Sequence, residues 1–226
     1  MWKYGRSGLL VGLFHCQLLL AQTGRTRSPR DQGPVSLEQE HHHRIVLQNA
    51  YIRILDGLVA IRDTTPMHVH AANSVVVFLS HSRFGIRTAD GAPVITGVEP
   101  GDLRYADYGD KPVTHIVWDE GPEDLHFYVV ELKQRDSTAD TCRFLSQPGL
   151  TPKWRKGGVT AYGWDIPPGW HCPLPASDCA FVLIDLSAEK AGCKRPYAFF
   201  PPHHRLSIDG HAHKDAQYIL LQLQVP

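Results

Sequence analysis

The sequence predicts an all-β protein folded as an antiparallel sandwich or barrel. Short runs of β-branched and aromatic residues recur along the chain, and turn dipeptides such as Asp56-Gly57 and Asp90-Gly91 separate several of them. The 19 glycines and 17 prolines suit a turn-rich β protein. No stretch shows helical periodicity over about ten residues. We therefore expect many short strands connected by turns.

The predicted strands begin near Ile45 and continue to about Lys133. Residues 51–55 and 58–61 are separated by the first turn dipeptide, so we expect them to form a hairpin. Residues 75–79 form an unbroken apolar run, which is typical of a strand buried on both faces. Further runs follow, at 83–87, 94–95, 103–105, 113–118 and 125–132.

Two histidines stand directly before the apolar run, in the segment Pro66-Met67-His68-Val69-His70. Side chains two residues apart on a strand point to the same face, so His68 and His70 form a pair of imidazoles suited to a metal ion. His115 lies in another strand-like run and is the candidate for a third ligand. Three imidazoles suit Zn, Fe, Mn, Ni or Cu, and leave coordination positions for water or a small molecule.

These segments resemble the two metal-binding motifs of the cupin superfamily. The first motif is His-x-His followed by Glu and an apolar strand, and the second begins with Gly-Asp and reaches a histidine. Here His68 and His70 match the first motif, while Gly101-Asp102 and His115 match the second. The resemblance covers about residues 45–133 and implies a jelly-roll β-barrel with the histidines projecting inward.

The chain departs from the cupin pattern at three positions, one of which is His81 in place of the glycine that closes the first motif. Ser74 stands where the family has its glutamate ligand, and Asp119 stands where an asparagine is usual. A serine hydroxyl is a poor ligand at neutral pH, so a barrel that has lost its metal stays an alternative. Asp119 is a candidate for orienting His115, or a turn residue, and Tyr105 and Trp118 are candidates for lining a pocket.

We interpret the chain as a metal-binding cupin that holds a small molecule at His68, His70 and His115. One alternative is a metal-dependent dioxygenase or isomerase, for which the sequence shows no clear general base. The other alternative is a metal-free binding or structural module. Lys and Arg total 23 and balance the 23 Asp and Glu, so no nucleic-acid partner is expected. The sequence leaves open whether the chain forms a homodimer.

The second half of the chain resembles the first. Residues 168–171 resemble 65–68, residues 181–184 resemble 75–78, and residues 218–223 resemble 127–132. The interval that would hold the middle hairpin is shorter, so this hairpin is shortened or lost. We expect a linker at 134–141, followed at 142–226 by a truncated second cupin unit or by an irregular extension.

The N-terminus and the cysteines indicate export to a periplasmic or extracellular compartment. Basic residues precede a short apolar stretch, so residues 1–22 are predicted to be a signal peptide and not a membrane span, with 23–44 a flexible lead-in. Four later cysteines then suggest two disulfides of undetermined pairing: Cys142, Cys172, Cys179 and Cys193. The alternative is a second metal site that also uses His171, His203 or His204.

Overall fold

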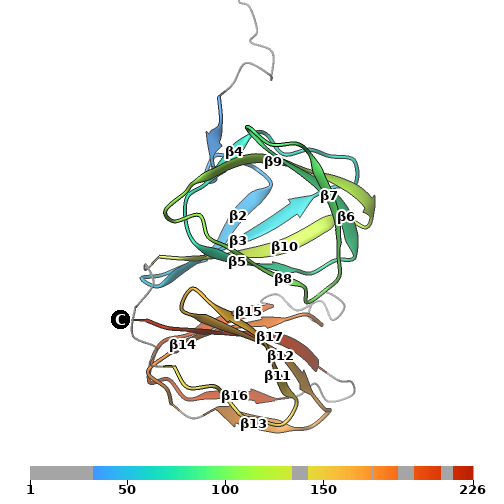
Figure 1. Ribbon diagram of the computed structural model, residues 1–226. Coiled ribbons are helices and arrows are strands. Elements are labelled where there is room, and N and C mark those ends of the chain that lie inside the picture. Colours follow the sequence, from blue (N-terminus) through green and yellow to red (C-terminus); the bar gives the residue numbers. More distant parts are fainter. Residues whose placement is uncertain (1–32, 134–141, 175, 188–195, 210–215, 226) are drawn as a thin grey trace, which may run out of the picture. The chain divides into compact units, whose positions relative to one another are not determined.

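The computed structural model of the chain describes residues 33–133, 142–174, 176–187, 196–209 and 216–225. The predicted signal peptide, the linker at 134–141 and Cys193 lie outside these residues. The described residues form strands and no helix, and all strand pairs are antiparallel except β1 with β4. They group into two double-sheet units, one over β1–β10 and one over β11–β17 (Figure 1). The all-β jelly-roll class predicted from the sequence is confirmed.

The first unit is a barrel of two five-stranded sheets. One sheet, in spatial order, consists of β1 (Val35–Ser36), β4 (His68–His70), β9 (Val113–Pro122), β6 (Ser82–Thr88) and β7 (Val94–Val98). The other consists of β2 (His43–Gln48), β3 (Ile52–Val59), β10 (Leu125–Leu132), β5 (Ser74–Phe78) and β8 (Leu103–Ala106).

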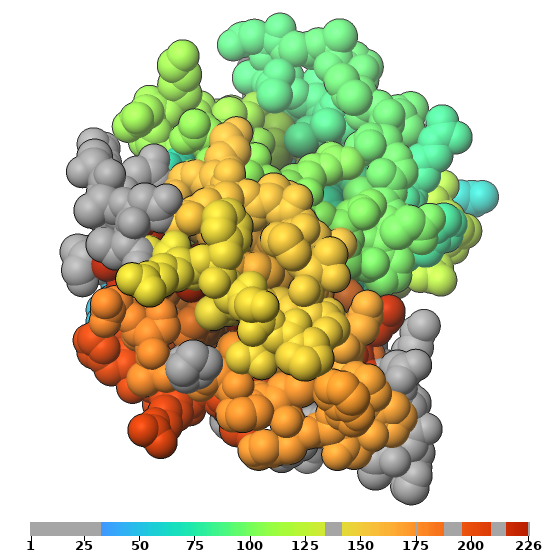
Figure 2. Space-filling view, turned by 60° about the horizontal axis from the view of Figure 1, so that its bottom comes forward, coloured from blue at the N-terminus to red at the C-terminus, as the bar shows by residue number. Residues whose placement is uncertain are grey.

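The second unit repeats this strand order with one hairpin fewer. Its five-stranded sheet consists of β11 (Leu150–Lys156), β12 (Val159–Ile166), β17 (Ala216–Leu223), β14 (Ala180–Asp185) and β15 (Tyr197–Phe200). Its second sheet pairs β13 (His171–Leu174) with β16 (Leu206–Asp209). The order β11-β12-β17-β14-β15 corresponds to β2-β3-β10-β5-β8, and the pair β13–β16 corresponds to β4–β9. No described strand corresponds to β6 and β7, so the topology favours a truncated cupin unit over an irregular extension. In Figure 2 the segment of β11 to β13 is seen on the near face in yellow and orange.

Apolar residues pack in three clusters, and one of them joins the two units. The interior of the first barrel holds one cluster and the interior of the second unit holds another. The third lies between the five-stranded sheets, where Ile54, Val75 and Val77 of the first unit pack with Val182 and Leu221 of the second. Strand β5 is therefore buried on both faces, as its unbroken apolar run predicts.

The structure differs from two local expectations and agrees with a third. Asp56-Gly57 forms no turn, because β3 runs straight through it and pairs along its whole length with β10. The described part of the expected flexible lead-in contains strand β1 and the buried residues Glu40 and His42. The Asp90-Gly91 turn is confirmed between β6 and β7.

One disulfide joins Cys142 to Cys179, with their Cα atoms 6.0 Å apart. This bond excludes these two cysteines from the alternative metal site with His171, His203 or His204. Cys172 is buried in the core of the second unit. A second disulfide stays a prediction, because Cys193 lies outside the described residues.

Gly57 is expected to be required for the packing of Phe127. A Cβ atom at Gly57 would lie 2.4 Å from Cε2 of the Phe127 ring on the paired strand. Gly57→Ala should therefore lower the free energy of unfolding by about 1–3 kcal/mol, measured by urea denaturation. Gly97→Ala is the matched control in β7, since its Cβ would meet nothing closer than 3.9 Å. Equal stability of the two variants would contradict this account.

Candidate metal centre

Three predicted ligands converge inside the first barrel. His68 and His115 form a cross-strand pair of β4 and β9, and His70 faces the same side of β4 as His68. The Nε2 atoms of His68 and His115 lie 3.0 Å apart. The ring centroids of His70 lie 5.1 Å from His68 and 4.8 Å from His115. All three side chains are buried.

A fourth imidazole, that of His43, joins this cluster from the start of β2. Candidate ligand nitrogens of His43, His68 and His70 lie within 4.8 Å of one another. The sequence analysis missed His43 because it places this residue in the polar lead-in of residues 23–44. In the structure, β2 begins at this residue, and its side chain, opposite Gly57, lines the barrel interior.

Hydrogen bonds fix which nitrogen two of the rings present to the centre. His68 Nδ1 donates to the Pro66 carbonyl oxygen at 2.9 Å, which leaves the lone pair of its Nε2 facing His115. His43 Nδ1 donates to Glu40 Oε2 at 2.5 Å, so in the neutral ring the lone pair is on Nε2. A carboxylate or carbonyl behind an imidazole is the usual arrangement around a protein-bound metal ion.

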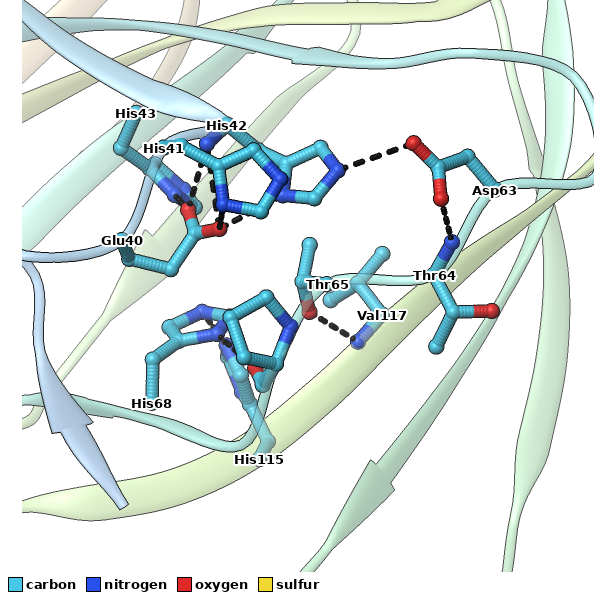
Figure 3. A network of polar contacts seen from close by, with 11 residues as sticks. Glu40, His41, His42, His43, Asp63, Thr64, Thr65, His68, His115 and Val117 are labelled. Carbon is cyan, nitrogen blue, oxygen red and sulfur yellow. Dashed lines mark hydrogen bonds and ion pairs between the residues drawn. The ribbon is translucent and has the colours of Figure 1, made fainter. Parts of the chain in front are cut away.

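The fully buried Glu40 carboxylate also forms hydrogen bonds with His42 (Figure 3). It accepts the His42 backbone N–H and a 2.6 Å bond from His42 Nδ1. His42 Nε2 lies 3.1 Å from Asp63 Oδ2, so the doubly protonated ring donates to two carboxylates. Burial disfavours charge on both partners. The hydrogen bonds nevertheless lower the pKa of Glu40 to about 2 and raise the pKa of His42.

Burial keeps three imidazoles of the centre neutral. Together with smaller contributions from the neighbouring imidazoles, it lowers the pKa of His70 to about 2 and that of His115 to about 3. Burial also lowers the pKa of His68. A metal ion requires the unprotonated ring, so this environment holds the three predicted ligands in the form that binds.

The residues present fit a transition-metal ion. Nitrogens that share one ion with bonds of ~2.1 Å lie roughly 3.0–3.4 Å apart, and the His68–His115 separation falls in this range. Ser74 faces the same interior, is buried, and its Oγ has no hydrogen-bond partner among the described residues. It stands where a family glutamate would add charge, so the ligand set here consists of imidazoles.

Three other predicted site residues do not line the centre with their side chains. Trp118 is three residues from His115 and faces the opposite side of β9, where its Nε1 donates to Glu120. Asp119 does not orient His115, because its carboxylate accepts bonds from Ser82 Oγ and the Gly121 N–H. Asp119 lies within β9 and pairs with Phe84 of β6, so it is not a turn residue either. Tyr105 borders the cavity, but its ring packs on Trp154 of the second unit, with the centroids 6.2 Å apart.

A cavity of about 180 Å³ adjoins the histidines within the barrel. Its walls are mainly apolar and include Phe78, Phe84 and Phe127. The centre therefore opens onto a space that holds a small molecule and is shielded by apolar side chains. Among the described residues, no helix is long and apolar enough to cross a membrane.

No family model and no curated protein matches the chain, but its fold is similar to solved structures. YhhW from Escherichia coli is 14% identical, with a TM-score of 0.53, over 81% of this chain and 90% of that chain. The bacterial pirin YhhW in complex with nickel(II) gives 13% identity and a TM-score of 0.52, over 81% and 91% of the two chains. AerE from Microcystis aeruginosa is 12% identical, with a TM-score of 0.51, over 81% and 97%. At these identities the likeness shows the fold, including its two-unit arrangement.

The substitution Glu40→Gln should make the free energy of unfolding less sensitive to a fall in pH. The folded-state pKa of Glu40 is about 2, below its ordinary value near 4.5, so its ionised form stabilises the fold. This contribution is present above the unfolded-state pKa and is lost as pH falls toward the folded-state pKa. The difference in unfolding free energy between wild type and variant should be on the order of 2 kcal/mol at pH 6 and shrink toward pH 2.

The matched control for this measurement is Glu120→Gln, which changes an exposed carboxylate on β9. Denaturant titrations at several pH values should show little change for this variant. A difference between wild type and the Glu40→Gln variant that stays constant from about pH 6 to about pH 2.5 would contradict the role assigned to the Glu40 charge.

Proposed function

We propose that this chain, which has the cupin fold, is an exported protein that binds one divalent transition-metal ion in its first barrel. The ion would bind a small molecule that occupies the adjoining cavity. His68, His70 and His115 would hold the ion, with His43 in place of the missing carboxylate ligand. The observation that carries this proposal is a cluster of four buried imidazoles from three different strands, in which His68 lies next to each of the other three. A bound ion of this kind supplies a Lewis acid with open coordination positions.

Two further observations support parts of the proposal. The bacterial pirin YhhW, which shares the fold, has been solved in complex with nickel(II), so Ni²⁺ is a suitable first probe. The Cys142–Cys179 disulfide agrees with an oxidising compartment, and therefore with export.

Metal titration by calorimetry tests the site. Wild type should bind about one equivalent of Ni²⁺ or Zn²⁺. His68→Ala and His115→Ala should each weaken binding by about 100-fold or more, because outer partners alone contribute 10- to 100-fold. Ser74→Glu should tighten binding by adding a carboxylate ligand. His81→Ala changes an exposed histidine outside the cavity and should bind as wild type does.

Two outcomes would count against the proposal. If neither wild type nor Ser74→Glu binds metal, the histidines are not a metal site and the metal-free module is correct. If His115→Ala binds as tightly as wild type, the ligand on β9 has been assigned wrongly. Metal content of protein purified from its natural source then identifies the ion.

Catalysis by a cupin-type dioxygenase or isomerase is the second candidate function. The Glu40–His43 pair favours it, because a buried carboxylate behind an imidazole is an arrangement that activates a general base. His43 borders the cavity and would accept a proton from a molecule bound there.

Turnover of phenolic and diketone compounds by the metal-loaded protein would test this candidate. His43→Ala should reduce turnover by at least about 100-fold while the other three histidines retain the metal. His41→Ala, which changes an exposed neighbour, should leave turnover unchanged. If the wild type shows no turnover, catalysis is ruled out for these compounds and the binding function is the one that stands.

A further inference from the structure

The cavity beside the histidines has one polar feature that the metal proposal does not use. Arg104 on β8 lines the cavity, although Tyr105 next to it packs outward on the second unit. Its guanidinium lies 5.2 Å from the ring centroids of both Phe78 and Phe84. These rings belong to the apolar wall, so the positive charge lies directly over the space that a ligand's apolar part would fill.

Arg104 is also in contact with solvent. The residue is exposed to solvent while its guanidinium lines the cavity. It spans the open side of the barrel, because β8 and β7 are edge strands of opposite sheets and Arg104 donates to Thr96 Oγ1 of β7 at 3.0 Å.

Arg104 differs from other arginines of its sheet in forming no ion pair among the described residues. Among the described residues, no carboxylate lies within salt-bridge distance of it, whereas Arg44 on β2 and Arg53 on β3 of the same sheet both have carboxylate partners. Asp102 is near enough to act on its pKa but forms no ion pair with it. The guanidinium therefore has donors that remain available for an anion.

The remaining polar groups of the cavity agree with an anionic ligand. No Asp or Glu lines it, and four of its polar groups are imidazoles. Tyr108 also lines the cavity, and its ring centroid is 6.0 Å from that of His70. A phenol donates a hydrogen bond to a carboxylate that Arg104 also holds.

From this arrangement we infer that the cavity binds a small carboxylate with an apolar body. The carboxylate would lie at Arg104 and Tyr108, and the apolar body would lie against Phe78 and Phe84 with its far end toward the histidines. A cavity of roughly 150 Å³ holds a benzene-sized molecule, so one ring or a short branched chain fits the 180 Å³ available. The inference rests on the proposed function for the role of the histidine end.

Calorimetric titrations with matched probes test the inference. Benzoate and isobutyrate should bind at least about tenfold more tightly than benzamide and isobutyramide, which have the same shapes without the charge. Each probe is titrated into metal-free and Ni²⁺-loaded protein. The preference for the carboxylates should be present in both forms, because Arg104 supplies it.

Substitutions of Arg104 test whether this residue causes the preference for carboxylates over amides. Arg104→Gln should reduce carboxylate affinity by about 10- to 100-fold and leave amide affinity nearly unchanged. Arg104→Lys should retain part of the preference, which separates lost charge from lost packing on the two rings. Arg87→Gln changes an exposed arginine of β6 that does not line the cavity, and should behave as wild type.

The outcomes distinguish this inference from the metal proposal. If no carboxylate binds better than its amide, or if Arg104→Gln keeps the full preference, the inference is wrong even where Ni²⁺ binds. If Ni²⁺ does not bind but the metal-free protein prefers carboxylates through Arg104, the metal proposal fails and the inference stands. Thermal melting of Arg104→Gln checks that the variant is folded.

Discussion

The antiparallel pairing of β4 with β9 is the constraint on which the candidate site depends. The register places His68 opposite His115, and the alternation of side chains along β4 adds His70 on the same face. The second unit shows how sensitive this arrangement is to register. Its pair β13–β16 occupies the same place in the strand order, yet the side chains that point inward are Cys172 and Leu174, while His171 is exposed. A shift of one residue in phase exchanges a polar interior for an apolar one.

The alternation of side chains between the two faces of a strand could also be predicted well from the sequence. The unbroken apolar run of β5, the shared face of His68 and His70, and the position of His115 all follow from a period of two residues. The same rule applied strictly to β9 would have excluded Trp118, which lies an odd number of residues from His115. The mistake there was to treat aromatic character as a sign of the pocket without checking its phase.

Other features could not be predicted, because they depend on contacts between distant segments. Glu40 and His43 lie in a short polar stretch with no strand periodicity, and their burial requires the closed barrel around them. Asp56-Gly57 has the composition of a hairpin turn, but Phe127 on the paired strand lies where the missing Cβ of Gly57 would be. The local preference for a turn is weaker than the pairing of β3 with β10 along its whole length.

The second unit supports the site by packing on the outer face of one sheet of the first barrel. Sheet β2-β3-β10-β5-β8 forms one wall of the cavity, and its other face is apolar and packs on β12, β14 and β17. That face would be exposed without the second unit. Tyr162, Trp164 and Phe181 pack together in the interior of the second unit, where no described strand corresponds to β6 and β7. In the first barrel Phe84 and Ile86 of that hairpin line the cavity. The hairpin is thus found in the unit with the cavity, and no described strand replaces it in the unit whose interior holds the three large aromatic side chains.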